Sequence, residues 1–229
     1  MMTDSETNRS GRRLIDLSHS IEHGMITYKG LPAPIIGDHM SREQSRSKYA
    51  AGTEFHIGKI EMVANTGTYL DSPFHRYADG HDLSEVALES IADLDGVVVR
   101  THERSTNAAA FQNLSLEGRA VLVHTGWDVH WRTEQYSSGH PFLSEDAAQF
   151  LADSKVALVG IDSFNIDSIE DGRRPVHSIL LAANIPIVEH LCGLGQLPDS
   201  GFTFFAVPAK VERFGSFPVR AFAIVTGAR

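Results

Sequence analysis

The stretch that decides the assignment of this chain lies between residues 65 and 75 and reads Asn65-Thr66-Gly67-Thr68-Tyr69-Leu70-Asp71-Ser72-Pro73-Phe74-His75. Gly67 permits a backbone with positive φ, and Pro73 fixes a bend after an extended residue. If the segment is extended, alternate residues from Asn65 to Asp71 project to one face. An amide, a phenol and a carboxylate on one face, followed by an imidazole at a proline turn, form a candidate site. A strand, a turn and a surface histidine are the alternative interpretation.

The composition is that of an ordinary globular chain. Of its 229 residues, 42% are hydrophobic and 21% are charged, which is enough apolar material for one sizeable core. No Gly-, Ser- or Pro-rich stretch in the interior looks like a linker, so we expect one domain over residues 14–229. Residues 1–13 are polar and lack the apolar h-region of a signal peptide, and we expect them to form a flexible tail.

Charge and cysteine content narrow the classes of function. The formal net charge is −9 and the charges are scattered, so nucleic-acid binding is not expected. No apolar run approaches the ~20 residues of a membrane span, so no membrane association is expected either. The single cysteine, Cys192, excludes an intrachain disulfide and fits a reducing compartment, which favours a cytoplasmic protein. We interpret Cys192 as a buried small hydrophobic residue rather than a nucleophile.

Short apolar runs indicate several strands buried on both faces. These predicted strands are 97–100, 120–124, 156–162, 185–188, 203–207 and 219–225. Predicted helices are fewer: one follows Ser144 as its N-cap, and short ones cover 178–183 and 83–91. Because strands outnumber helices and alternate with them, we predict an α/β fold with a mixed, barrel-like central β-sheet.

A second group of candidate residues lies much further along the chain. His177 precedes a short apolar helix, and Glu189 ends the strand-like run Ile187-Val188-Glu189. A buried carboxylate is costly unless it is paired or bound to a cation. Glu189 is therefore a candidate ligand, with exposure on an edge strand as the alternative.

Together these segments resemble the cyclase family, which includes kynurenine formamidase and isatin hydrolase. The family signature reads His-x-Gly-Thr-His-x-Asp-x-Pro-x-His, and five of its positions are matched in register by Gly67, Thr68, Asp71, Pro73 and His75. The spacing of His177 and Glu189 is similar to that of the family's later pair of metal ligands. Flanking motifs match as well: Asp16-Leu17-Ser18-His19, Thr125-Gly126-Trp127, Gly160-Ile161-Asp162-Ser163, Gly201-Phe202, Pro208 and Pro218-Val219-Arg220-Ala221.

The resemblance covers residues 14–226 and implies a swivelling β/β/α-like domain. It implies a metal-dependent hydrolase of a small amide, formamide, lactam or lactone, and assembly as a homodimer or homotetramer. Its metal ligands would be Asp71, His177 and Glu189, with His75 as general acid/base. Backbone N–H groups near Gly67 and Thr68, and the ring of Phe74, would contact the substrate.

Two signature histidines are replaced, by Asn65 and by Tyr69. An amide oxygen is a weak ligand for zinc, and a phenol with a pKa near ~10 ionises only in a strong cationic field. Two hypotheses follow. In the first, one divalent cation, zinc or manganese, is retained, with help from Asn65 or Tyr69. In the second, the site is metal-free: Tyr69 donates a hydrogen bond to the substrate, and the protein is an atypical enzyme or a small-ligand-binding protein.

Two further histidines, His19 and His56, lie near enough in sequence to replace a missing ligand. We expect structural roles for both. Asp162, at the end of a predicted strand, is a candidate supporting group or a turn cap.

Overall fold

The computed structural model describes residues 11–226. One nine-stranded sheet dominates it, and its strands are named here in their spatial order: β1 (Arg12–Asp16), β13 (Phe222–Thr226), β11 (Ser200–Phe205), β5 (Leu94–Arg100), β7 (Ala120–His124), β9 (Leu158–Ile161), β10 (Ile187–Glu189), β4 (Tyr69–Asp71) and β12 (Ser216–Pro218). Strands β5, β7, β9 and β10 are parallel, and the others pair antiparallel. The mixed sheet and the α/β class are therefore confirmed.

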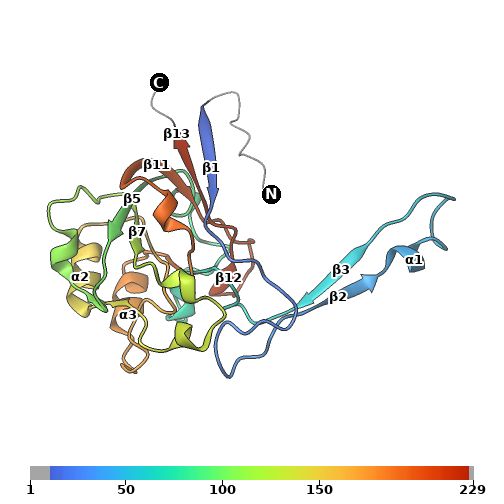
Figure 1. Ribbon diagram of the computed structural model, residues 1–229, viewed down its shortest axis with the longest axis horizontal. Coiled ribbons are helices and arrows are strands. Elements are labelled where there is room, and N and C mark those ends of the chain that lie inside the picture. The colour runs from blue at the N-terminus through green and yellow to red at the C-terminus, as the bar shows by residue number, and fades with distance from the viewer. Residues whose placement is uncertain (1–10, 227–229) are drawn as a thin grey trace.

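Both faces of the parallel strands are buried, as their continuous apolar sequence predicts. On β7, Val121 and Val123 point into one hydrophobic cluster, and Ala120 and Leu122 into another. The first cluster is covered by α2 (Glu145–Asp153) and α3 (Pro175–Ala182), which lie side by side on one face of the sheet (Figure 1). The second fills the space enclosed by β1, β11 and β13.

Local sequence explains where the helices begin. Ser144 is the N-cap of α2, as predicted, and its hydroxyl accepts from the Ala147 N–H. Helix α3 begins at Pro175, earlier than predicted, because a proline in the first turn is already set for helical φ. His177 therefore lies inside this helix. The predicted helix over 83–91 is wrong, since only a single 3-10 turn forms there.

The remaining elements are short. They comprise β2 (Ile35–Met40), β3 (Ile57–Glu61), β6 (Ser105–Thr106), β8 (Phe142–Leu143), the helix α1 (Arg42–Ser45) and the 3-10 turns Pro73–His75, Leu88–Ser90, Ala108–Phe111, Trp127–His130, Glu134–Ser137 and Leu194–Gln196. None of the described helices is long and apolar enough to cross a membrane.

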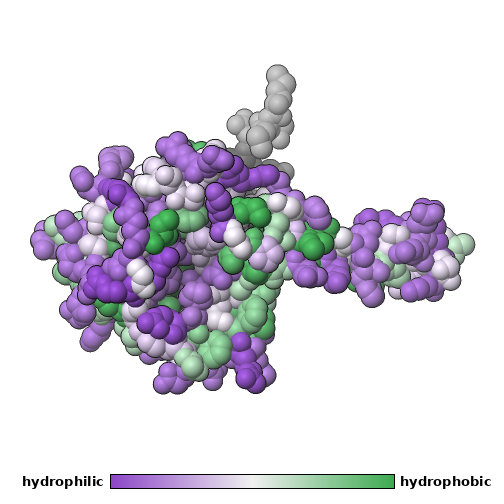
Figure 2. Space-filling model, turned by 90° about the horizontal axis from the view of Figure 1, so that it is seen from below, coloured by the Kyte–Doolittle hydropathy of each residue, from purple (hydrophilic) through white to green (hydrophobic). Residues whose placement is uncertain are grey.

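Strands β2 and β3 pair only with each other and form a projecting arm, defined here as residues 35–61, with α1 near its tip (Figure 1). Figure 2 shows that the arm stands clear of the body, with apolar surface near its base. An isolated two-stranded hairpin is at best marginally stable in water. The arm therefore exposes a surface that the body of the chain does not cover.

The decisive stretch is less regular than an extended strand. Only Tyr69–Asp71 forms a strand, and Gly67 has a φ of 67°. Strand β4 lies beside β10, so that Asp71 pairs with Ile187 and Tyr69 with Glu189. This pairing brings the two candidate segments together. The single domain over 14–229 stays a prediction, and most of the tail 1–13 lies outside the described residues, although β1 already begins at Arg12.

Candidate active site

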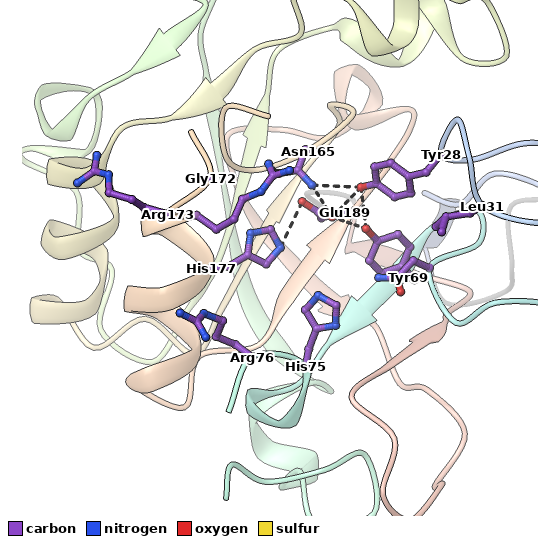
Figure 3. A pocket seen from close by; sticks show the side chains of 12 residues that line it. Tyr28, Leu31, Tyr69, His75, Arg76, Asn165, Gly172, Arg173, His177 and Glu189 are labelled. Atoms are coloured by element: carbon purple, nitrogen blue, oxygen red, sulfur yellow. Dashed lines mark hydrogen bonds and ion pairs between the residues drawn. The ribbon is translucent and has the colours of Figure 1, made fainter. Parts of the chain in front are cut away.

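A cavity of about 290 Å³ opens where β4, β10 and the start of α3 meet (Figure 3). Its walls come from four separate parts of the chain: Tyr28 and Leu31; Asn65, Tyr69, His75 and Arg76; Asn165, Gly172, Arg173, Arg174 and His177; and Glu189. Two predicted metal ligands, His177 and Glu189, line the bottom of the cavity, and the third, Asp71, lies directly beneath them. Side chains distant in sequence thus converge on one small cavity.

The floor consists of Asp71, His177 and Glu189. The Nε2 atom of His177 lies 3.6 Å from Asp71 Oδ2 and 3.7 Å from Glu189 Oε1. Both carboxylates are fully buried, and Asp71 Oδ2 has no hydrogen-bond partner among the described residues. A buried carboxylate oxygen without a hydrogen-bond donor is suited to bind a cation. Two carboxylates and an imidazole are ligands that suit zinc or manganese, so the residues fit the metal that the resemblance implies.

A carboxylate that the sequence analysis missed, Asp167, orients His177. Asp167 Oδ2 lies 2.6 Å from His177 Nδ1, and the same carboxylate accepts the N–H groups of Val176 and His177. A hydrogen bond from Nδ1 to a carboxylate leaves Nε2 free to face a metal. Asp167 is nearly fully buried.

Without a cation, this arrangement favours a protonated His177. Burial lowers its pKa, but the hydrogen bond to Asp167 and the nearby carboxylates of Asp71 and Glu189 outweigh that effect and raise the pKa to about 10. The imidazolium then supplies one positive charge between two carboxylates. A bound divalent ion would supply two.

His75 lies at the edge of the same site, as the signature implies. Its Nδ1 is 2.8 Å from Ser216 Oγ, and Ser216 in turn donates to Asp71 Oδ1. The ring is 35% exposed, unlike the buried His177. Asp71, His75 and His177 all place a ligand atom within 4.8 Å of one another. His75 is thus held by one nitrogen and accessible to a substrate with the other.

The phenol of Tyr69 is hydrogen-bonded to the floor rather than free in the cavity. It donates to Glu189 Oε2, and its oxygen lies 2.8 Å from that of Tyr28. Tyr28 also lies 3.1 Å from Glu189 Oε2, while the Ile166 N–H donates to Oε1. Figure 3 shows the two phenols on one side of Glu189 and His177 on the other. Glu189 therefore turns one oxygen toward the tyrosines and the other toward His177.

Burial, together with the charge of Glu189, raises the pKa of both Tyr69 and Tyr28 well above 10. Both phenols therefore remain protonated hydrogen-bond donors. Asn65 lines the cavity and remains a predicted ligand.

Three predicted substrate contacts are not brought to the cavity. The Gly67 N–H already donates to Thr27 Oγ1 at 2.9 Å, and the Thr68 hydroxyl donates to the His190 carbonyl at 2.5 Å. Both groups hold the loop before β4 and are not available as oxyanion donors. Phe74 lines a separate, smaller cavity beside Asn65 and His75. Contact of Thr68, through its N–H, and of Phe74 with the substrate stays a prediction.

The other histidines have structural surroundings, as expected. The ring of His19 stacks on Trp131, with 4.0 Å between ring centroids. His56 lies on the arm and pairs with Asp38. Asp162 accepts the N–H groups of Thr125 and Gly126 and caps that turn.

The sequence analysis also missed the roles of Tyr28, Asn165 and Ser216. The first two bond the Tyr69–Glu189 group, and Ser216 bridges Asp71 and His75. Tyr28 lies in an irregular segment and Ser216 at the edge of a short strand, so no periodic pattern marks them. The cluster Asp162-Ser163-Phe164-Asn165-Ile166-Asp167 following a buried strand was a usable signal for Asn165 and Asp167.

Cys192 should be a poor nucleophile, which we state as a testable prediction. Burial, with the charge of Asp128 next in importance, raises the pKa of its thiol to about 12. Because the thiolate is the reactive form, alkylation of the folded protein by iodoacetamide at pH 8 should be about a thousandfold slower than in denaturant. Mass spectrometry of timed samples measures both rates, and comparable rates would contradict the interpretation.

Comparison with known proteins identifies the family and the fold. The family model Cyclase matches residues 15–168. The kynurenine formamidase of Bacillus cereus is 27% identical over 208 residues, covering 90% of this chain and 95% of that protein. A solved structure described as a potential metal-dependent hydrolase with cyclase activity aligns with a TM-score of 0.77 at 24% identity, covering 95% of this chain and 100% of its own.

Isatin hydrolase A from Labrenzia aggregata, solved with benzyl benzoate, aligns with a TM-score of 0.78 at 19% identity, covering 95% of each chain. The two structural alignments show the same fold over nearly the whole chain, which confirms the predicted cyclase-like architecture. Since the family model spans more than half of the chain and includes the stretch from Asn65 to His75, this protein belongs to the Cyclase family.

Proposed function

We propose that this protein hydrolyses a small amide, formamide, lactam or lactone, with one divalent cation held by Asp71, His177 and Glu189. The observation that carries the proposal is the unpartnered, fully buried Asp71 Oδ2 facing His177 Nε2 beneath an open cavity. Family membership and the kynurenine formamidase relatives favour an amide bond as the target.

The chemistry divides between the cation and the side chains. A bound zinc or manganese ion supplies Lewis-acid polarisation of the carbonyl and a water of lowered pKa. His75 moves the proton that the leaving amine or alkoxide requires. Ser216 fixes its ring through Nδ1, so that Nε2 is the atom that exchanges the proton. Tyr69 and Tyr28 hold Glu189 in place through its Oε2 oxygen.

The test is hydrolysis of a panel containing formanilide, isatin and a small lactone. Protein is stripped with a chelator, then assayed alone and after addition of zinc or manganese. We expect turnover of at least one member only with metal. A panel that is untouched with either metal would remove the proposal.

The metal-free alternative is supported by the position of His177, whose Nε2 lies 3.6 Å from Asp71 Oδ2 and 3.7 Å from Glu189 Oε1 and can pair with both carboxylates. Metal analysis of protein purified without chelator separates the two functions. A stoichiometric ion supports the hydrolase. If no ion is found and the metal-free protein turns over substrate, the protein is an atypical enzyme. If it retains a ligand but does not turn it over, it is a small-ligand-binding protein.

Restoring the two missing histidines should change the number of bound ions. In the double variant Asn65→His, Tyr69→His, two imidazoles replace an amide and a hydrogen-bonded phenol at the edge of the cavity. Imidazole is a good zinc ligand, whereas amide and neutral phenol are weak ones. We expect plasma mass spectrometry to find one ion per wild-type chain and two per variant chain. Tyr69→Phe is the control and should keep one. Two ions in the wild type would contradict the one-cation proposal.

We also propose that the chain forms a homodimer or homotetramer through the arm. Ile36 and Ile60 pair across its two strands on one face, and both are exposed. The double substitution Ile36→Lys, Ile60→Lys should dissociate the assembly, because it charges an apolar contact. Light scattering after size exclusion measures the mass, with Lys59→Glu on the opposite face as control. An unchanged mass would exclude the arm as the contact. The cytoplasmic location stays a prediction.

A further inference from the structure

Two unpaired guanidinium groups at the cavity point to the chemistry of the substrate. We propose that Arg76 and Arg174 bind a carboxylate on the part of the substrate that does not react, so that the site selects small anionic amides. This inference rests on the proposed hydrolase function and specifies its substrate class.

The charges that line the cavity are unequal. Three arginines reach it, Arg76, Arg173 and Arg174, and Glu189 is the one carboxylate among the described residues that line it. Glu189 is already bonded to two phenols and a backbone N–H and faces the floor. The upper part of the cavity therefore carries net positive charge, although the chain as a whole has a formal charge of −9.

Arg173 is not available for a ligand. Its guanidinium forms ion pairs with Asp171 at 2.8 Å and with Glu145 at 3.2 Å. Figure 3 shows it extending away from His177 and Glu189. It is therefore not part of the proposed carboxylate site.

Arg76 is held in place but not neutralised. Its Nε donates to Ser178 Oγ at 3.2 Å, and its guanidinium carbon lies 5.2 Å from the centre of the Tyr77 ring. Over residues 11–226, neither of its Nη atoms has a hydrogen-bond partner and no carboxylate forms an ion pair with it. Arg76 follows His75 in the chain, and both residues line the cavity.

Arg174 approaches from the other wall. Its Nη1 donates to Asn165 Oδ1 at 3.2 Å and to the Ser168 carbonyl at 3.3 Å. Its Nε and Nη2 have no partner within the described part of the chain, and no carboxylate pairs with it. Asn165 in turn bonds Tyr28, so the guanidinium is linked to the site beneath it.

The backbone of Arg174 adds an independent indication. This residue has a φ of 50° and a ψ of 59° at the start of α3, the left-handed region that glycine or asparagine occupies more readily. Strained positions of non-glycine residues cluster at functional sites. Arg174 therefore occupies a backbone conformation that is unfavourable for a residue with a side chain.

A carboxylate is the ligand group that fits these donors. A guanidinium offers parallel N–H groups that match the two oxygens of a carboxylate. A cavity of about 290 Å³ admits a small aromatic or aliphatic acid. The negative net charge of the chain repels anions. The positive charges of the two arginines attract a carboxylate substrate to the cavity in spite of this repulsion.

The test compares matched acids and esters. N-formylaminobenzoates with the carboxylate in the ortho, meta and para positions are assayed beside their methyl esters on metal-loaded protein. We expect kcat/KM of wild type to favour at least one acid over its ester. Arg76→Gln and Arg174→Gln should each lower kcat/KM for that acid by about 10- to 100-fold, mainly through KM, and change the ester by less than about threefold. Arg104→Gln removes an arginine that pairs with Glu170 and does not line the cavity, and it should change neither.

The outcomes separate this inference from the hydrolase proposal. If acids and esters are hydrolysed equally and neither arginine variant discriminates between them, the carboxylate site is overturned and the hydrolase stands. If nothing is hydrolysed, the hydrolase fails, and calorimetry of benzoate against benzamide then decides the arginine pair alone. If the protein binds benzoate and the Arg76→Gln substitution weakens that binding, the carboxylate site formed by Arg76 and Arg174 is supported. If benzoate and benzamide bind equally well, the site is excluded. The separate Arg76 variant guards against misfolding at position 174.

Discussion

Asp71→Asn is expected to lose the bound cation and to reduce hydrolysis by on the order of 10³-fold or more, since a catalytic metal supplies several kcal/mol and each ~1.4 kcal/mol is a factor of ten. The substitution keeps the shape of the side chain but removes its charge. It also replaces one carboxylate oxygen with an amide NH₂ group. That group would face His177 if it replaces Oδ2, or Ser216 if it replaces Oδ1. Metal content by plasma mass spectrometry and turnover of formanilide measure the two effects.

The matched control is Asp162→Asn. Asp162 is equally buried, but its carboxylate accepts hydrogen bonds from the N–H groups of Thr125 and Gly126 and does not contact His177. This variant should lose thermal stability, because it breaks buried charge-assisted hydrogen bonds, and should keep its metal. If Asp71→Asn retained a stoichiometric ion, the floor described here would not be the metal site.

His75→Ala is expected to lower kcat by about 10²- to 10⁴-fold, the usual contribution of a general acid/base. The cation should remain bound, since Asp71, His177 and Glu189 are all intact. The ring is bonded through Nδ1 to Ser216 and is partly exposed. Added imidazole should therefore restore part of the activity by entering the space that the ring leaves.

The same variant distinguishes the two roles open to His75, because its nitrogen also lies within reach of Asp71 and His177. Loss of the ion together with activity would make His75 a ligand. Ser216→Ala provides an intermediate case, in which the His75 ring is present but has lost its hydrogen bond to the Ser216 hydroxyl. We expect it to keep the ion and to lose less activity than His75→Ala. Full activity in His75→Ala would exclude both roles.

The strands that were predicted best were those buried on both faces. Residues 120–124 form β7 with the bounds expected from the sequence, because a continuous apolar run suits a strand that is buried on both faces of the sheet. The weakest prediction was the helix over 83–91, where local propensity favoured a helix but the chain makes only one 3-10 turn. There the backbone and side chain of Asp82 bond to Glu85 and Arg213 instead. Tertiary context overrode a weak local preference.

In the site, the residues found from sequence lie in a spaced motif, whereas the missed residues Tyr28, Asp167 and Ser216 lie outside it. Asp71, His75, His177 and Glu189 are brought together as the resemblance implied. Asp167, Tyr28 and Ser216 reach it from three other segments. Gly67 and Thr68, which were predicted to contact the substrate, also make hydrogen bonds that hold the loop before β4.

The sequence by itself determined the family, the mixed α/β class and the replacement of two histidines by Asn65 and Tyr69, because these follow from residue identity and spacing along the chain. Only the tertiary structure decided what that replacement does. Pairing of β4 with β10 places the Tyr69 phenol against Glu189, and Tyr28 arrives from a distant loop to bond the same oxygen. Burial keeps both phenols protonated. The unpartnered oxygen of Asp71 beside His177 likewise results from contacts between segments, which spacing along the chain does not encode.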